Sequence, residues 1–195
     1  MNPAKAVFID RDGVIVDEDY YPIIMPDDVH LLPGAAQAIR QFKDAQLPVV
    51  VITNQAIIAR GLATLAQLEA VHQRMRELLW QEAQARVDAI YYCPHHANPE
   101  QETRVAEFSI ECECRKPKPG LLLNAAEEMG IDLAQSYMIG DSNIDILAGR
   151  SAGTKTILLT STGKGGRDGK QVVEPDYRVE SLGDAVGIIL GLVRQ

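Results

Sequence analysis

The sequence predicts an α/β protein with a doubly wound, Rossmann-like parallel sheet. Short apolar runs rich in β-branched and aromatic residues lack the alternation of a half-exposed strand, which is typical of buried parallel strands. Amphipathic stretches of helical period separate these runs, as in βαβ units. The 195 residues are 46% hydrophobic and 24% charged, which suits one domain with a full core. We therefore expect residues 1–195 to form a single domain.

The expected elements alternate along the chain. The predicted strands are residues 6–9, 48–52, 89–92, 137–139 and 156–159. The predicted helices are residues 34–45, 65–84, 120–129, 144–152 and 181–192. Residues 94–118 have no strong period and are rich in Cys, His, Glu and Pro, and a loop of that length is usually functional or needs bracing.

Charge and hydropathy exclude several classes of function. The net charge of -8 argues against a nucleic-acid binder, which would present a basic face. It does not exclude a small anionic substrate, because a pocket can be basic on an acidic protein. The N-terminal apolar run is too short for a signal peptide, and no run approaches the roughly 20 residues that span a bilayer. We expect a cytoplasmic monomer with no membrane or nucleic-acid partner.

The first predicted strand ends in two aspartates. Asp10 and Asp12 flank Arg11 and precede Gly13 and Val14, so both carboxylates can point to one side of an extended segment. Such a pair repels unless a cation or a shared proton lies between the two groups, and Mg²⁺ prefers these hard oxygen ligands. An aspartate can attack phosphorus, while its neighbour protonates the leaving oxygen and then activates water. The alternative is a solvated acidic loop.

Later strands deliver complementary groups to the same edge of the sheet. The second ends in Thr53-Asn54-Gln55, where a hydroxyl and backbone amides can hold a phosphoryl oxygen or simply cap the loop. The fourth ends in Gly140-Asp141, with Asp141 as a third cation ligand, and Asp145 either orients that ligand or belongs to the first helical turn. Lys116 can neutralise the nucleophile and the phosphoryl group, whereas Lys118 is interpreted as a surface residue.

Together these motifs resemble the haloacid dehalogenase (HAD) superfamily of phosphatases. Asp10-x-Asp12-Gly13-Val14, Thr53, Lys116 and Gly140-Asp141 with Asp145 occur in the order of that family, over about residues 5–160. The resemblance implies a HAD-like fold, with Asp10 as nucleophile and Asp12 as general acid/base. It also implies that Thr53 and Lys116 steady the phosphoryl group. Mg²⁺ would be held by Asp10, the Asp12 backbone carbonyl and Asp141.

A cysteine-histidine loop predicts a zinc site. Cys93-Pro94-His95 and Cys112-Glu113-Cys114 bracket a loop at about residues 93–114 and use every cysteine of the chain. Three cysteines and one histidine match a closed tetrahedral structural site, with His96 as the rival to His95. The alternative is buried cysteine with surface histidine. Because this loop ends beside Arg115 and Lys116, zinc would also fix where the lysine enters the active site.

Within the superfamily, this pattern resembles the zinc-loop branch of heptose bisphosphate phosphatases and histidinol-phosphate phosphatases. The heptose branch implies removal of the C7 phosphate from a heptose 1,7-bisphosphate, in the carbohydrate metabolism that supplies lipopolysaccharide precursors. Histidinol phosphate or another small phosphomonoester is the alternative substrate. The segment between Asp12 and Thr53 has room for only one short helix, so we expect no large cap domain. The implied substrate-binding residues are Glu18, Asp19, Tyr20, Tyr21, Thr53, Asn54, Gln55, Ala56, Arg60, Arg115 and Lys116.

The chain departs from the branch at two places. Ala56-Ile57 stands where Ser-Gly is usual, which removes a glycine with easy access to positive φ. Ser142 follows Asp141 where a phosphate-binding lysine is frequent. The Gly- and Lys-rich segment 162–170 fails the spacing of a P-loop and is interpreted as a loop from which Lys164 can reach substrate phosphate. His30 and His72 are expected at the surface, and Trp80 is expected to pack.

Overall fold

The computed structural model describes residues 4–97, 104–166 and 173–193. Its strands are β1 (Val7–Ile9), β2 (Val49–Asn54), β3 (Ala89–Cys93), β4 (Tyr137–Gly140), β5 (Lys155–Leu159) and β6 (Tyr177–Val179). Its α-helices are α1 (Ala35–Asp44), α2 (Leu65–Ala83), α3 (Gly120–Met129), α4 (Asn143–Ala152) and α5 (Leu182–Val193). Short 3₁₀ helices are η1 (Glu18–Tyr20), η2 (Pro26–Asp28), η3 (Ala106–Phe108) and η4 (Leu133–Gln135).

The strands form one parallel sheet in the order β3-β2-β1-β4-β5-β6. Strand β1 lies in the middle, with Val7 opposite Val49 of β2 on one side and opposite Tyr137 of β4 on the other. The chain winds outward from β1 in both directions, so the switch in strand order falls between β1 and β4. The predicted doubly wound sheet is confirmed.

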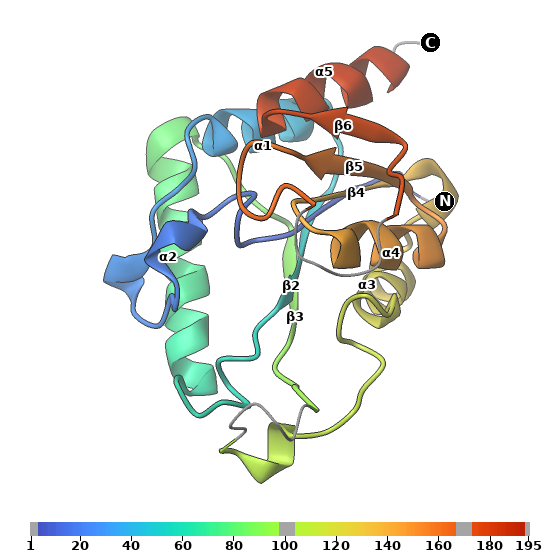
Figure 1. Cartoon of the computed structure of the whole chain (residues 1–195). Coiled ribbons are helices and arrows are strands. Elements are labelled where there is room, and N and C mark those ends of the chain that lie inside the picture. The colour runs from blue at the N-terminus through green and yellow to red at the C-terminus, as the bar shows by residue number, and fades with distance from the viewer. Residues whose placement is uncertain (1–3, 98–103, 167–172, 194–195) are drawn as a thin grey trace.

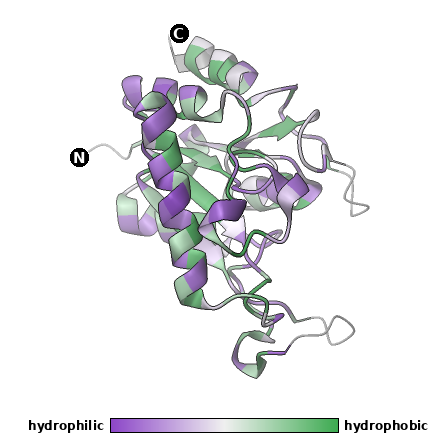
Figure 2. Ribbon diagram, turned by 90° about the vertical axis from the view of Figure 1, so that its left-hand side faces the viewer, coloured by the Kyte–Doolittle hydropathy of each residue, from purple (hydrophilic) through white to green (hydrophobic). Residues whose placement is uncertain are grey.

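Helices cover both faces of the sheet (Figure 1). Val7 and Ile9 point into the larger apolar cluster, which includes buried residues of α1, α2 and α5. Phe8 points to the opposite face and packs with buried residues of α3 and α4. Full burial of a Val, Ile or Phe side chain stabilises the folded state by about 1.5–3 kcal/mol. Because successive side chains of β1 point to opposite faces, β1 stabilises both helical layers. Figure 2 shows the apolar strands behind α2, along which hydrophilic and hydrophobic residues alternate.

Two expectations about single elements need correction. Strand β6 was not predicted, because its three residues form too short a run to show a period. His72 is buried at 1% exposure, not at the surface. It shares one face of α2 with Leu68, Met75 and Leu79, all of which are buried. His30 is exposed as expected, while Trp80 is 44% exposed and lies under the Arg86 guanidinium.

Between β1 and β2, the described chain forms η1, η2 and α1. Between β3 and α3 it forms the loop that carries the cysteines and η3. No helix of the described residues is both long enough and apolar enough to cross a membrane.

Candidate active site

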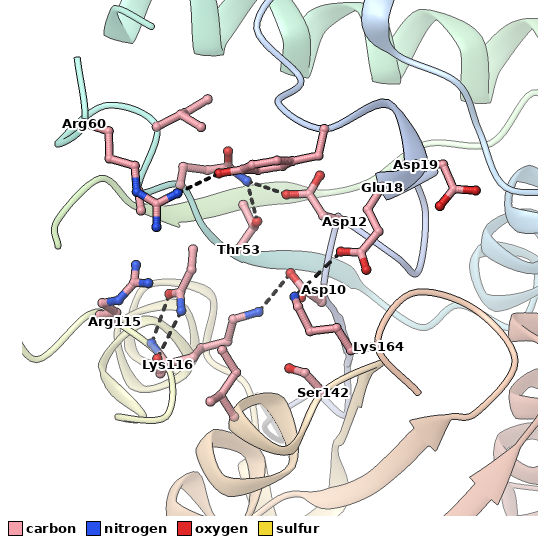
Figure 3. Close-up of a pocket in the computed structure, with 16 residues that line it drawn as sticks. Asp10, Asp12, Glu18, Asp19, Thr53, Arg60, Arg115, Lys116, Ser142 and Lys164 are labelled. Atoms are coloured by element: carbon pink, nitrogen blue, oxygen red, sulfur yellow. Dashed lines mark hydrogen bonds and ion pairs between the residues drawn. The ribbon is translucent and has the colours of Figure 1, made fainter. Parts of the chain in front are cut away.

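The carboxyl ends of the central strands surround a cavity of about 510 Å³. Asp10 and Asp12 follow β1, Thr53 and Asn54 end β2, and Ser142 follows β4. Figure 3 shows Asp10, Thr53, Lys116 and Lys164 converging on this space from different segments. Parallel strands place all these ends at one edge, so residues far apart in the sequence become neighbours.

Lys116 is the central cation of the site. Its side chain is 1% exposed, and its Nζ lies 2.8 Å from Asp10 Oδ1 and 2.7 Å from Asp145 Oδ1. The Nζ also donates to the Ile52 carbonyl at 2.7 Å. Burial opposes charge on this lysine, but the two carboxylates outweigh burial and raise the pKa of Lys116. Lys116 is therefore a fixed positive charge against the Asp10 carboxylate.

The amide of Asn54 holds the backbone of Lys116. Asn54 Oδ1 accepts from the Lys116 N–H at 3.0 Å, and Asn54 Nδ2 donates to the Lys116 carbonyl at 3.0 Å. Asn54 was predicted to bind substrate and does line the cavity. The side-chain amide of Asn54 nevertheless hydrogen-bonds to the backbone of Lys116. Strand β2 therefore fixes the position of Lys116, which lies 62 residues further along the chain.

Three aspartates form a carboxylate cluster that suits a hard cation. Oxygens of Asp10, Asp141 and Asp145 lie within 4.8 Å of one another. Burial, together with the neighbouring carboxylates, raises the pKa of Asp10 and of Asp141, although Lys116 opposes the shift at Asp10. Asp141 Oδ1 is buried and accepts no hydrogen bond from any described residue. An unpaired buried oxygen among crowded carboxylates is the setting that Mg²⁺ stabilises, so these residues fit the predicted cation.

Asp145 belongs to the first turn of α4, which is one of the two roles considered for it. Its Oδ2 accepts from the Ser142 N–H at 3.1 Å and from the Ser142 hydroxyl at 2.6 Å, which closes a capping box at the start of α4. Its Oδ1 faces Lys116, as described above. Asp145 thus ties the first turn of α4 to Lys116.

Asp12 is held by donors on both oxygens. Arg11 Nε lies 2.8 Å from Asp12 Oδ1, while Arg11 Nη2 and Gln55 Nε2 lie 3.0 Å and 2.9 Å from Asp12 Oδ2. Burial alone would raise the pKa of Asp12. The charge and hydrogen bonds of Arg11 and the hydrogen bond of Gln55 outweigh burial and lower this pKa. Gln55 Nε2 also donates to Thr53 Oγ1 at 2.8 Å (Figure 3). The predicted acid/base residue and the predicted phosphoryl-binding hydroxyl are therefore linked through one amide.

The remaining wall of the cavity carries charged residues of both signs beside uncharged ones. Glu18, Asp19, Tyr21, Ala56, Arg60 and Arg115 line it, as predicted for substrate-binding residues. Tyr20 does not line it and instead stacks on His30, with ring centroids 4.0 Å apart. Arg60 Nη1 donates to the Tyr21 hydroxyl at 3.1 Å.

Four further residues line the cavity, of which only Lys164 was expected to reach substrate phosphate. They are Ile57, Ser142, Ile144 and Lys164. Lys164 Nζ lies 3.6 Å from Glu18 across the cavity, and its backbone N–H donates to Asp141 Oδ2 at 2.5 Å. Ile57 also packs in a small apolar cluster, and neither Ala56 nor Ile57 has positive φ. The absent glycine is thus not required by the backbone, and nothing in the sequence marked the two isoleucines as site residues.

The Cys/His loop brings its four predicted ligands together. Cys93, His95, Cys112 and Cys114 offer ligand atoms that all lie within 4.8 Å of one another. The three Sγ–Sγ distances are 3.0, 3.3 and 3.5 Å, and His95 Nδ1 lies 3.3 Å from Cys114 Sγ. Ligands about 2.3 Å from a tetrahedral zinc would lie about 3.8 Å apart, so a modest expansion accommodates the ion. The His95 carbonyl accepts from Arg115 Nη1 at 3.1 Å, which ties this loop to the cavity wall.

Comparisons with known proteins agree with this site. Residues 113–185 match the Hydrolase_like, HAD-hydrolase-like family model. The D-glycero-beta-D-manno-heptose-1,7-bisphosphate 7-phosphatase of Pasteurella multocida is 39% identical over 192 residues, which cover 96% of this chain and 98% of that protein. The Escherichia coli K12 protein of the same name is 43% identical over 162 residues, covering 82% of this chain and 80% of that protein.

A solved structure gives the same result. The D,D-heptose 1,7-bisphosphate phosphatase of B. bronchiseptica, complexed with magnesium and phosphate, superposes with a TM-score of 0.83 at 34% identity. The match covers 96% of this chain and 99% of that chain. Sequence, fold and site geometry agree, and the chain belongs to the HAD superfamily of phosphatases, in the family of the heptose 1,7-bisphosphate phosphatases.

Proposed function

We propose that this protein is a magnesium-dependent phosphatase that removes the C7 phosphate of D-glycero-D-manno-heptose 1,7-bisphosphate through an aspartyl-phosphate on Asp10. The observation that carries the proposal is the placement of the Asp10 carboxylate against the Lys116 ammonium and within 4.8 Å of Asp141 and Asp145, in a cavity whose wall also carries Arg60, Arg115 and Lys164. The names of the relatives favour the heptose substrate over histidinol phosphate.

The residues divide the reaction into two steps. In the first, an Asp10 oxygen bonds to phosphorus, the bond from phosphorus to the sugar oxygen breaks, and Asp12 gives that oxygen its proton. In the second, water attacks phosphorus, its proton passes to Asp12, and the bond to Asp10 breaks. Lys116 and the Thr53 hydroxyl hold the phosphoryl oxygens throughout.

Asp10, the Asp12 backbone carbonyl and Asp141 would hold Mg²⁺. The bound ion supplies positive charge that offsets the crowded carboxylates and the phosphoryl oxygens. We also assign a structural Zn²⁺ to Cys93, His95, Cys112 and Cys114, because four protein ligands leave no open position for chemistry.

The second phosphate of the substrate needs its own cations. Arg115 and Arg60 lie on the cavity wall, and Lys164 lies beside Glu18. We assign Arg115 and Arg60 to the second phosphate and the sugar, with Glu18, Asp19 and Tyr21 on the sugar hydroxyls. A guanidinium suits this role because its fork matches phosphate bidentately.

Phosphate release with Mg²⁺ tests the proposal directly. The α and β anomers of the heptose bisphosphate, histidinol phosphate and a panel of sugar monophosphates serve as substrates, and ³¹P spectra of the product show which phosphate has gone. We expect the heptose 1-phosphate as product and the highest kcat/KM for one heptose anomer. Higher efficiency on histidinol phosphate would reject the substrate assignment. Turnover by Asp10→Asn equal to that of the wild type would reject the nucleophile.

A further inference from the structure

Arg11 has the largest fully buried side chain of the described residues, although it lies between the two reactive aspartates. It is 1% exposed and is not among the residues that line the cavity. Asp10 and Asp12 line the cavity, whereas the buried Arg11 side chain contacts Asp12 and Gln55. Arg11 is therefore placed to act on its neighbours and not on the substrate.

The guanidinium grips Asp12 as a fork. Two of its nitrogens lie 2.8 Å and 3.0 Å from the two carboxylate oxygens, the parallel geometry that gives such pairs their directional precision. Arg11 Nη2 also donates to Gln55 Oε1 at 3.1 Å, which turns the Gln55 amide so that its Nε2 faces Asp12 and Thr53. Arg11, Asp12 and Gln55 thus form a closed ring of hydrogen bonds, with Thr53 attached.

The ring leaves Asp12 little freedom. An ionised carboxylate offers about four acceptor positions, and the three bonds from Arg11 and Gln55 occupy three of them. The free position is the one available for the proton that Asp12 carries. Rotation of the carboxylate would break the fork and leave a buried guanidinium without its partner, which is strongly unfavourable.

We propose that Arg11 and Gln55 are positioning residues that hold the Asp12 carboxylate for proton transfer, with Gln55 coupling its position to that of Thr53. The inference rests on the proposed function, in which Asp12 protonates the leaving oxygen and then deprotonates the attacking water. Loss of the fork misplaces Asp12 in both steps but leaves Asp10, Lys116 and the cavity wall in place.

Two esters with different leaving groups separate this role from a purely structural one. p-Nitrophenolate leaves phosphorus without a proton, so only the water step of p-nitrophenyl phosphate hydrolysis needs Asp12. With Mg²⁺ present, we expect Arg11→Met to release about one p-nitrophenolate per active site rapidly and then to turn over about 10²-fold more slowly than the wild type. With an alkyl monophosphate, the first turnover should itself slow by about 10²-fold. Arg11→Lys, which keeps the charge without the fork, should recover part of the rate.

Controls keep the inference falsifiable. Arg40→Met removes an exposed arginine that pairs with Asp44, and it should behave as the wild type. If Arg11→Met does not fold by circular dichroism, Gln55→Met tests the ring instead, with the same pattern at about tenfold. The positioning role would be overturned if the burst amplitude and the steady rate of Arg11→Met on p-nitrophenyl phosphate fell together. An unchanged ratio between the rates on the alkyl and aryl esters would overturn it as well. A wild-type protein that releases no phosphate from either ester or from the heptose bisphosphate would instead reject the proposed function.

Discussion

The backbones of Gly13 and Gly163 are in direct contact, and a Cβ on either residue would lie 2.9 Å from the Cα of the other. Both residues have positive φ, +75° at Gly13 and +52° at Gly163. The contact places the loop after β5 directly on the turn that follows Asp10, the proposed nucleophile. A Cβ on Gly163 would also overlap Asp141 Oδ2, the oxygen that accepts from the Lys164 N–H.

Gly163→Ala should weaken the magnesium site more than it weakens the fold. The added methyl group pushes on the Asp141 carboxylate, so we expect the Mg²⁺ concentration for half-maximal phosphate release to rise about tenfold, or about 1.4 kcal/mol. Gly130→Ala is the matched control, because Gly130 has φ +64° and no atom within 4 Å of the added Cβ. Gly130→Ala introduces the backbone strain of about 1–2 kcal/mol without any steric clash. Equal Mg²⁺ dependence in the two variants would show that the contact does not reach Asp141.

Lys116 and Lys118 form a second matched pair. Lys116→Met removes the buried charge between Asp10 and Asp145, and we expect kcat to fall by about 10²- to 10³-fold, because one preorganised electrostatic contact is lost. Lys118 is 45% exposed and pairs with Glu113, so Lys118→Met should keep kcat within about twofold. Steady-state phosphate release measures both variants. Comparable losses would indicate that the segment, and not the ammonium, limits turnover.

Zinc loss should disable catalysis at a distance. Cys114 lies two residues before Lys116, and the His95 carbonyl holds Arg115. Cys112→Ser leaves three ligands, so we expect zinc content by mass spectrometry to drop from about one ion per chain and kcat to fall with excess Mg²⁺ present. The midpoint of thermal unfolding should fall as well. An unchanged midpoint and unchanged kcat in zinc-free protein would contradict the link between this loop and Lys116.

His72 should make stability depend on pH. Burial, followed by the charges of Arg11 and Arg76, lowers the pKa of His72 to about 3. The unfolded chain takes up this proton near pH 6.5, while the folded protein does not, so stability falls as pH falls from about 6.5 to about 3. The slope is up to about 1.4 kcal/mol per pH unit.

Urea unfolding at several pH values in this window checks the prediction. Other groups titrate there too, so the informative quantity is the difference between the wild type and His72→Gln, which has no proton to gain. That difference should shift in favour of the variant as pH falls. A difference that stays constant with pH would show that His72 is protonated in the folded protein.

The sequence was sufficient for β1 to β5 and for the candidate groups at their carboxyl ends. Buried strands are marked by apolar runs, and parallel topology brings their ends together, so Asp10, Thr53 and Asp141 were candidates from position, while the family resemblance supplied their roles. Strand β6 and the buried face of His72 were missed for different reasons. Strand β6 is too short to show a period. His72, in contrast, shares the helical spacing of Leu68, Met75 and Leu79, and this spacing could have predicted its burial.

What the sequence did not reveal is how polar residues divide their bonds. Asn54 and Gln55 were both assigned to substrate, yet one amide holds the backbone of Lys116 and the other joins Asp12 to Thr53. No role was predicted for Arg11, whose side chain is buried. The partner of each polar side chain depends on which groups meet in the folded structure. Arg11 and Gln55 are 44 residues apart, and Asn54 and Lys116 are 62 residues apart, so no local sequence pattern predicts these hydrogen bonds.

The central position of β1 also determines when the protein becomes an enzyme during its synthesis. The strand that carries Asp10 is made first and can pair with β2 early, but its other edge stays open until β4 has been made. Asp141 and Asp145 come with that late segment, and Lys116 is also distant from the start. The nascent chain therefore exposes a hydrogen-bonding edge, and carries no assembled carboxylate cluster, until about three quarters of the polypeptide has left the ribosome.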